Sequence, residues 1–294
     1  MGSSQIYKST DTSAPALIAT TGGLITVLDG VLVNGYGTFS PLGWTKEYQS
    51  PDNLQAVYRN KGTGWFLRVN NSIYFDATYS SAKIEVFEVM KDWETGYLRC
   101  PEGGVDHYIA YADTHDGGRA VPWWIIGDDK GFWFCAEYDT PGTGLVFATY
   151  LGDYIPYHLE NESNWISLAS TNNGRRGDQF KTYTLIVENE SARIPRTHLN
   201  ALSIEKINFY RGLGIDNSGS FLGATAVTTP IPILAKPLIG LDGLVIGEIP
   251  GLLEVVGGVI DRDILEAANG ASVHIFTTYG GGLIGLIEGE GFRP

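Results

Sequence analysis

Cysteine is scarce in this 294-residue sequence, which contains only Cys100 and Cys135. Two cysteines are too few for a disulfide scaffold, and they are either free or joined in a single bridge. Basic residues are also few, because 20 Lys and Arg stand against 33 Asp and Glu and give a net charge of −13. Proteins that bind nucleic acid rely on clustered Lys and Arg to contact phosphates. We therefore expect no nucleic acid among the partners of this chain.

Long apolar runs are missing as well. Residues 1–10 (MGSSQIYKST) lack the apolar core of a signal peptide, so we expect no secretion. The longest apolar-looking stretch, residues 230–260, is interrupted by Lys236, Asp242 and two glutamates. A membrane-spanning helix needs about 20 mostly apolar residues, so we expect no membrane among the partners either.

Glycine and aromatic residues are abundant, with 38 Gly, 16 Tyr, 12 Phe and 7 Trp. Glycine weakens a helix interior by about 1 kcal/mol relative to alanine. Aromatic side chains suit the half-buried faces of pleated sheets. Together with short, turn-separated strand-like segments, this composition predicts a mainly β protein built as an antiparallel β-sandwich or barrel.

Local patterns place the elements of this fold. Apolar residues from Leu24 to Leu32 recur at helical spacing and are followed by Asn34-Gly35, which predicts one short N-terminal helix. Two β-hairpins are predicted where strand-like runs flank a glycine-containing loop, at 56–59 with 65–69 and at 123–126 with 132–137. Further strands are expected at 83–90, 145–151, 182–187, 241–249 and 272–277, and a short helix at 261–268.

A change in composition divides the chain. All seven tryptophans precede Ile194, and the residues after it are rich in Gly, Ile, Leu and Pro. We predict an N-terminal arm with the short helix at 1–42 and a Trp-rich β-sandwich core at 43–193. The remaining Gly-rich and apolar β region, 194–294, is a small domain or an assembly arm. On this division, a chain lacking residues 195–294 should fold but fail to assemble.

Reactive side chains form no recognised catalytic motif. The segment 107–116 contains His107, Asp113, His115 and Asp116, but its two histidines would lie roughly 26 Å apart along an extended strand. The Asp and Gly residues at its end are typical of a turn. A nucleophile elbow, a zinc-protease helix motif and a phosphate loop are all missing from the sequence. We therefore expect no catalytic residue, cofactor or metal, and predict that the chain is not an enzyme.

A carboxylate pair beside tryptophan is an alternative interpretation, because glycoside hydrolases place two carboxyl groups across the sugar. Acidic residues lie near tryptophans at Asp92, Glu94, Asp128, Asp129, Glu137 and Asp139. With 33 acidic residues such neighbours arise by chance, and no characteristic spacing marks one pair. Most tryptophans are expected to fill the core, with a sugar-stacking platform as the alternative. Strand alternation should put Trp123 and Trp124 on opposite faces, one of them exposed or at an interface.

Five short segments follow one another in the N-terminal part: residues 5–15 (QIYKSTDTSAP), 28–37 (LDGVLVNGYG), 43–46 (GWTK), 56–59 (AVYR) and 66–69 (FLRV). Their order resembles a family of tailed-bacteriophage virion structural proteins. Two later segments are similar more loosely, at 147–154 (FATYLGDY) and 249–252 (IPGL). The resemblance implies a structural subunit of the virion, made in the host bacterial cytoplasm and placed in the neck (collar) or in the tail and baseplate.

Such a subunit would contact copies of itself and other phage structural proteins through symmetric interfaces. We expect these contacts in the polar N-terminal segment and the apolar C-terminal region, at Tyr7, Asp11, Pro15, Pro230, Ile231, Pro232, Leu241, Val245, Leu252 and Leu253. Two alternatives belong to other classes. One is a tail module that binds a receptor or a host-surface glycan, and the other is a protein that decorates the capsid surface.

Overall fold

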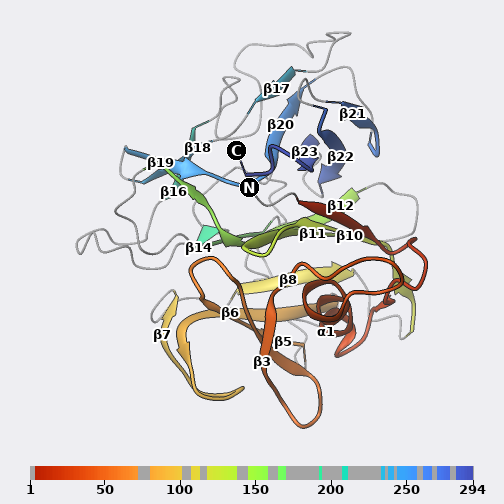
Figure 1. Ribbon diagram of the computed structural model, residues 1–294, viewed down its shortest axis with the longest axis vertical. Coiled ribbons are helices and arrows are strands. Elements are labelled where there is room, and N and C mark those ends of the chain that lie inside the picture. The colour runs from red at the N-terminus through yellow and green to blue at the C-terminus, as the bar shows by residue number, and fades with distance from the viewer. Residues whose placement is uncertain are drawn as a thin grey trace, which may run out of the picture.

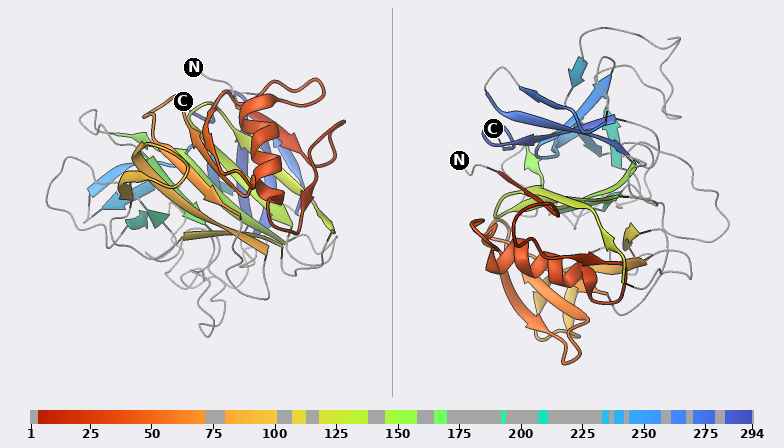
Figure 2. Two further views of the ribbon diagram at one scale, coloured as in Figure 1. Left: turned by 90° about the horizontal axis from the view of Figure 1, so that it is seen from below. Right: turned by 90° about the vertical axis from the view of Figure 1, so that its right-hand side faces the viewer.

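Three β layers stacked on one another make up the protein, as its computed structural model shows (Figure 1). The right-hand view of Figure 2 presents the layers edge-on, from the N-terminal layer at the bottom to the C-terminal layer at the top. The predicted mainly β fold with one short N-terminal helix is confirmed. The structure describes residues 4–71, 80–100, 107–112, 118–137, 145–157, 165–169, 192–193, 207–210, 233–235, 238–241, 244–256, 261–266, 270–278 and 283–293.

The N-terminal layer combines the helix with an antiparallel sheet. Helix α1 (Gly23–Leu28) continues as a π-helical turn, η1 (Asp29–Asn34), and ends at Gly35, whose φ of 71° is natural for glycine. The sheet has the order β3-β4-β5-β6-β7, and β8 pairs with the first half of β6. Its strands are β3 (Thr45–Gln49), β4 (Gln55–Arg59), β5 (Phe66–Asn70), β6 (Ser80–Met90), β7 (Gly96–Cys100) and β8 (His107–Ala112).

The middle layer is the antiparallel run β1-β10-β11-β12. These strands are β1 (Gln5–Lys8), β10 (Trp123–Gly127), β11 (Gly131–Glu137) and β12 (Leu145–Asp153). Every residue of β11 is buried, as expected for a strand with a layer on each side. The two predicted hairpins are confirmed as β4–β5 and β10–β11.

The largest sheet does not stop at the middle layer but curls into the third, as a half-barrel. β12 pairs in parallel with β22 through Leu145–Thr277 and Val146–Thr278, and the order then continues β22-β23-β20-β17. The added strands are β22 (Ser272–Thr278), β23 (Leu283–Glu288), β20 (Leu252–Val256), β17 (Ile233–Ala235) and β21 (Ile264–Glu266). β14 (Trp165–Ala169) pairs with β12, and β15 (Ala192–Arg193) pairs with β14.

Two smaller sheets complete the described elements. The first pairs β2 (Leu17–Ile18) with β9 (Ala120–Val121). The second has the order β13-β19-β18-β16, with β13 (Ile155–Pro156), β19 (Leu244–Glu248), β18 (Leu238–Leu241) and β16 (Ile207–Tyr210). The strand predicted at 182–187 lies outside the described residues.

Each gap between layers is filled by its own apolar core. Trp123 and Phe132 point into the core shared by the N-terminal and middle layers. Trp133, Tyr150 and Phe276 belong to the core between the middle and third layers. Strand alternation along β10 does put Trp123 and Trp124 on opposite faces, as predicted: the first is fully buried, and the second packs, half-buried, against the other core.

One expectation changes with the structure, and another stays a prediction. The short helix predicted at 261–268 is wrong at its centre, because Ile264–Glu266 forms β21 and pairs with Ser272–His274 of β22. Backbone pairing to a neighbouring strand has outweighed local helical spacing there. The expected boundary at residue 194 lies outside the described residues, but strands from before and after it join in one sheet through β12 and β22.

Candidate functional site

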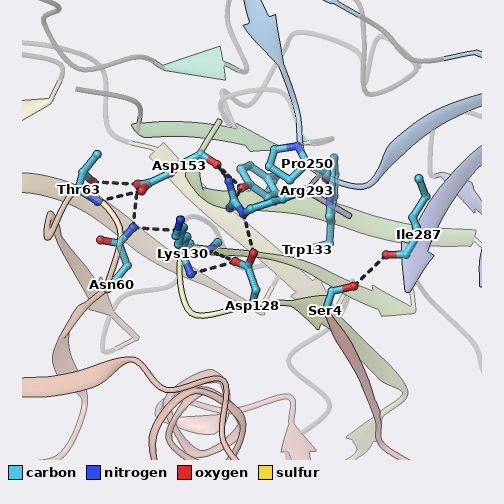
Figure 3. A network of polar contacts seen from close by, with 12 residues as sticks. Ser4, Asn60, Thr63, Asp128, Lys130, Trp133, Asp153, Pro250, Ile287 and Arg293 are labelled. Atoms are coloured by element: carbon cyan, nitrogen blue, oxygen red, sulfur yellow. Dashed lines mark hydrogen bonds and ion pairs between the residues drawn. The ribbon is translucent and has the colours of Figure 1, made fainter. Parts of the chain in front are cut away.

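The densest described network of buried polar groups lies where the hairpin turn after β10 meets the end of β12 (Figure 3). In the turn, Asp128 Oδ1 accepts hydrogen bonds from the backbone N–H groups of Lys130 and Gly131, both at 2.9 Å. This is the Asx-turn chemistry that an aspartate offers at a tight turn. The second oxygen of Asp128, Oδ2, faces the C-terminal segment that contains Arg293.

Asp153, the last residue of β12, fastens the turn to the loop between β4 and β5. Its Oδ1 accepts hydrogen bonds from Asn60 Nδ2 and Thr63 Oγ1, both at 2.8 Å, and its Oδ2 accepts one from Thr63 N at 2.9 Å. Asn60 Nδ2 also donates to the Lys130 carbonyl at 2.9 Å. Burial raises the pKa of Asp153, and the hydrogen bonds from Thr63 and Asn60 offset only part of that shift.

Arg293 closes the network from the C-terminal end of the chain. Its Nε lies 2.6 Å from Asp128 Oδ2, its Nη1 donates to the Asp153 carbonyl at 2.8 Å, and its Nη2 donates to the Tyr150 hydroxyl at 2.9 Å. The Tyr150 hydroxyl donates in turn to the Asp153 carbonyl at 2.6 Å. Only 13% of the Arg293 side chain is exposed, so its charge is compensated mainly by Asp128. We call these residues, with Asn60 and Thr63, the polar junction.

The local sequence makes room for the polar junction. A Cβ atom on Gly62 would overlap the Asp153 carboxylate, which cannot move aside because three hydrogen bonds hold it. Glycine at this position therefore lets the β4–β5 loop approach β12 closely. Chemically, the arrangement is suited to fastening: charge-assisted hydrogen bonds join segments that lie up to 165 residues apart.

The N-terminal residues expected at assembly contacts are bound to the chain's own body. Tyr7 is fully buried, and its hydroxyl donates to the Ser40 carbonyl at 2.6 Å. Asp11 accepts hydrogen bonds from Lys8 N at 2.7 Å and the Tyr36 hydroxyl at 2.9 Å. The Pro15 carbonyl accepts one from Trp123 Nε1 at 3.0 Å. Contact of these residues with another subunit stays a prediction, and for Tyr7 it would require β1 to leave its core.

The C-terminal residues of the same set fall into three groups. Pro230, Ile231 and Pro232 lie outside the described residues. Leu241 ends β18 and Val245 lies in β19, where the backbone alone is described. The third group, Leu252 and Leu253 of β20, is buried in two different apolar clusters of this chain. Among the described members of the two terminal sets, Tyr7, Leu252 and Leu253 lie in three different apolar clusters.

The carboxylates considered for a glycosidase are spread over two layers in the described part of the chain. Asp128 and Glu137 lie at opposite ends of β11, a strand of seven residues that spans roughly 20 Å. Glycosidase carboxyl groups lie about 5–10 Å apart. Asp92 belongs to the β6–β7 turn of another layer, where it accepts hydrogen bonds from Glu94 N and Thr95 N. Asp139 lies outside the described residues.

Metal ligands and cysteine thiols are the remaining candidates for chemistry. Among the described residues no group of three or more His, Cys, Asp or Glu is placed to hold a metal ion. His107 begins β8, whereas Asp113, His115 and Asp116 lie outside the description. Cys135 is free and buried, and burial raises the pKa of its thiol to about 12. None of the described helices is long and apolar enough to cross a membrane.

Sequence reasoning missed the central residue of the polar junction. Asp128 stands in a recognisable Gly-Asp-Asp-Lys-Gly turn, and Asn60 begins a recognisable hairpin loop. Nothing near Arg293 indicates that it reaches either of them, since only tertiary packing brings residue 293 to residue 128. Comparison with known proteins adds no assignment: no protein-family model and no curated protein matches this chain.

Proposed function

We propose that this chain is a structural subunit of a tailed-phage virion, placed in the neck or in the tail and baseplate. It would act by binding copies of itself and other particle proteins, without catalysis. The N-terminal sequence resemblance provides the class of protein. The observation on the molecule that supports the role best is the fastening of both described ends of the chain to its folded body.

That fastening has two parts. At the N-terminal side, Ser4 pairs with Gly289, whose N–H donates to the Ser4 carbonyl at 3.2 Å. At the C-terminal side, Arg293 inserts into the polar junction (Figure 3). A particle component must hold its shape under load, and a folded body that binds both Ser4 and Arg293 resists unravelling at either segment.

A glycan-binding tail module is the second candidate, favoured by one observation. Tyr97 on β7 is 44% exposed, and Lys91 Nζ lies 5.0 Å from the centre of its ring. An exposed aromatic ring beside a donor group suits a sugar, which stacks its apolar face and hydrogen-bonds its hydroxyls. Binding of the purified protein to a glycan array, lost on Tyr97→Ala, would favour this candidate over a purely architectural subunit.

The experiment that tests the first proposal is removal of the gene from the phage genome, followed by complementation in trans. We expect particles made without the protein to lack a neck or tail structure, and mass spectrometry of wild-type particles to detect the chain in several copies. Normal, infective particles made without it, or its absence from purified virions, would contradict the proposal.

A further inference from the structure

Strand β1 forms an edge of the largest sheet within the described part of the chain. Its antiparallel ladder with β10 continues to Ser9, whose N–H donates to the Trp123 carbonyl at 2.9 Å. Hydrogen bonding alternates along such a ladder, so residues 5, 7 and 9 face β10 with their backbone groups. The backbone groups of Ser4, Ile6 and Lys8 therefore point away from the sheet. Unpaired groups in such a row are a template for a strand from another chain.

At one end of β1, Asp11 occupies the outward groups of Lys8. The Lys8 N–H donates to Asp11 Oδ2 at 2.7 Å, and the Asp11 N–H donates to the Lys8 carbonyl at 3.0 Å. The Tyr36 hydroxyl donates to the same Asp11 oxygen at 2.9 Å and holds the carboxylate in place. Both backbone groups of Lys8 are thus used within the chain.

At the other end, the third layer supplies the partners. The carboxylate of Glu288, the last residue of β23, faces the Ile6 backbone, which helps to lower its pKa. His274 Nε2 lies 2.8 Å from Glu288 Oε2 and orients this carboxylate. Next to it, the Gly289 N–H is bonded to Ser4, 2.9 Å from the side-chain oxygen and 3.2 Å from the carbonyl. The outward N–H of Lys8 is therefore capped by one carboxylate, and the outward side of Ile6 faces another.

We propose that Asp11 and Glu288 close the β1 edge against strand addition by a second copy of this chain. An incoming strand would have to displace both caps and bury two carboxylates that had lost their hydrogen bonds, which is costly. Copies of one chain carry the same edge at the same concentration, so a second copy is the competitor that the edge meets most often. This proposal does not depend on the proposed function, because it concerns how the isolated chain behaves in solution.

The test compares the double variant Asp11→Ala, Glu288→Ala with wild type. Backbone amide exchange in residues 4–9 and sedimentation over a concentration series are the two measurements. We expect exchange at Ile6 and Lys8 to accelerate by about tenfold or more, the change for loss of one hydrogen bond to a charged group. We also expect the double variant to self-associate at concentrations where wild type does not.

Matched controls separate the effect of losing the two carboxylates at β1 from the effects of a changed net charge and of a lower stability. Glu88→Ala, Glu94→Ala removes two exposed carboxylates of the N-terminal sheet and should behave as wild type. Tyr36→Phe removes the other hydrogen bond of Asp11 and should leave exchange at Lys8 within a few-fold of wild type. If the alanine variant does not fold, the double variant Asp11→Asn, Glu288→Gln replaces it. Each amide keeps the size of the carboxylate and one acceptor oxygen, so amide exchange and self-association should change in the same direction but by less.

Two results would overturn the proposal. Faster exchange without any gain in association would mean that the carboxylates only stabilise β1. Unchanged exchange at both amides would mean that the carboxylates do not cap the edge in solution.

Discussion

Arg293 is the single residue on which the polar junction depends most. Its guanidinium reaches a carboxylate in the turn after β10 and a backbone carbonyl and a tyrosine hydroxyl of β12. Arginine suits this position because its planar group carries several donors at fixed angles. The burial of Asp128 and Arg293 means that loss of either partner leaves a charge without compensation.

We predict that Arg293→Ala lowers the free energy of unfolding by about 3–5 kcal/mol, the usual cost of removing one partner from a buried ion pair. Urea denaturation followed by tryptophan fluorescence measures the change. Lys61→Ala is the matched control, because Lys61 lies 3.9 Å from Asp129 in an exposed pair and its loss should cost less than about 1 kcal/mol. Equal effects of the two substitutions would contradict the role assigned to Arg293.

Gly62 has a steric rather than an electrostatic role. Gly62→Ala should displace Asp153 and lower the free energy of unfolding by about 1–3 kcal/mol, the range for overpacking a close contact. Gly270→Ala serves as comparison, since Gly270 has a φ of 79° but no atom within 4 Å of an added Cβ. Its cost of about 1–2 kcal/mol reports backbone strain alone. The added effect at Gly62 should disappear in an Asp153→Ala background, where the two substitutions couple.

Among the elements, β11 stands out because it is buried on both faces. Trp133 and Cys135 face the third layer, whereas Phe132 and Phe134 face the N-terminal layer. The strand is thus shared by two cores, and any reagent that reaches it must first separate layers. Cysteine reactivity provides a direct measure of this protection.

We predict that Cys135 does not react with a thiol reagent at pH 8 while the protein is folded. Burial raises its pKa to about 12, so almost no thiolate is present, and the side chain is only 1% exposed. Labelling of a Cys100→Ser variant with and without denaturant isolates the signal of Cys135. Rapid labelling of the native variant would show that the layers do not enclose β11.

The contact of His274 in β22 with Glu288 in β23 predicts a specific dependence on pH. The hydrogen bond from His274 lowers the pKa of Glu288 below its usual value of 4.5. The unfolded state then binds the proton more readily, so the stability from Glu288 is present above pH 4.5 and is lost as pH falls below it. Unfolding free energies between pH 6 and 3 should decline less steeply in Glu288→Gln than in wild type. Identical slopes would contradict this assignment.

Some of the elements can be predicted from local sequence patterns, and others cannot. The β4–β5 and β10–β11 hairpins and the helix were predictable, because short-range signals such as glycine-containing turns determine them. At 261–266 the local pattern suggested a helix, but pairing with β22 decided the outcome. The Asp128–Arg293 pair could not be predicted, since it depends on how β12 meets β22 and on no local signal.

On the scale of the whole molecule, the third layer is part of the folded body. Trp133 Nε1 donates to the Pro250 carbonyl at 2.9 Å, and Phe276, Ile284 and Leu286 pack against the middle layer. Stacking of this kind makes the middle layer depend on residues beyond 250. These contacts argue against the expectation that a chain lacking residues 195–294 folds by itself.

We predict that a chain lacking residues 195–294 loses cooperative unfolding and binds a hydrophobic dye. Its middle layer would expose Trp133 and Tyr150 to water and would leave Asp128 without Arg293. Circular dichroism, dye fluorescence and thermal denaturation together measure this outcome. A cooperative transition near that of the full chain would instead support an independent N-terminal unit.

Cryo-electron microscopy of purified virions tests the proposed role of the chain as an architectural component of a tailed-phage particle. We expect repeated copies in the neck or in the tail and baseplate, each with its three layers intact and Arg293 in the polar junction. A particle map complete at side-chain resolution in which the three-layer fold occupies no position would contradict it.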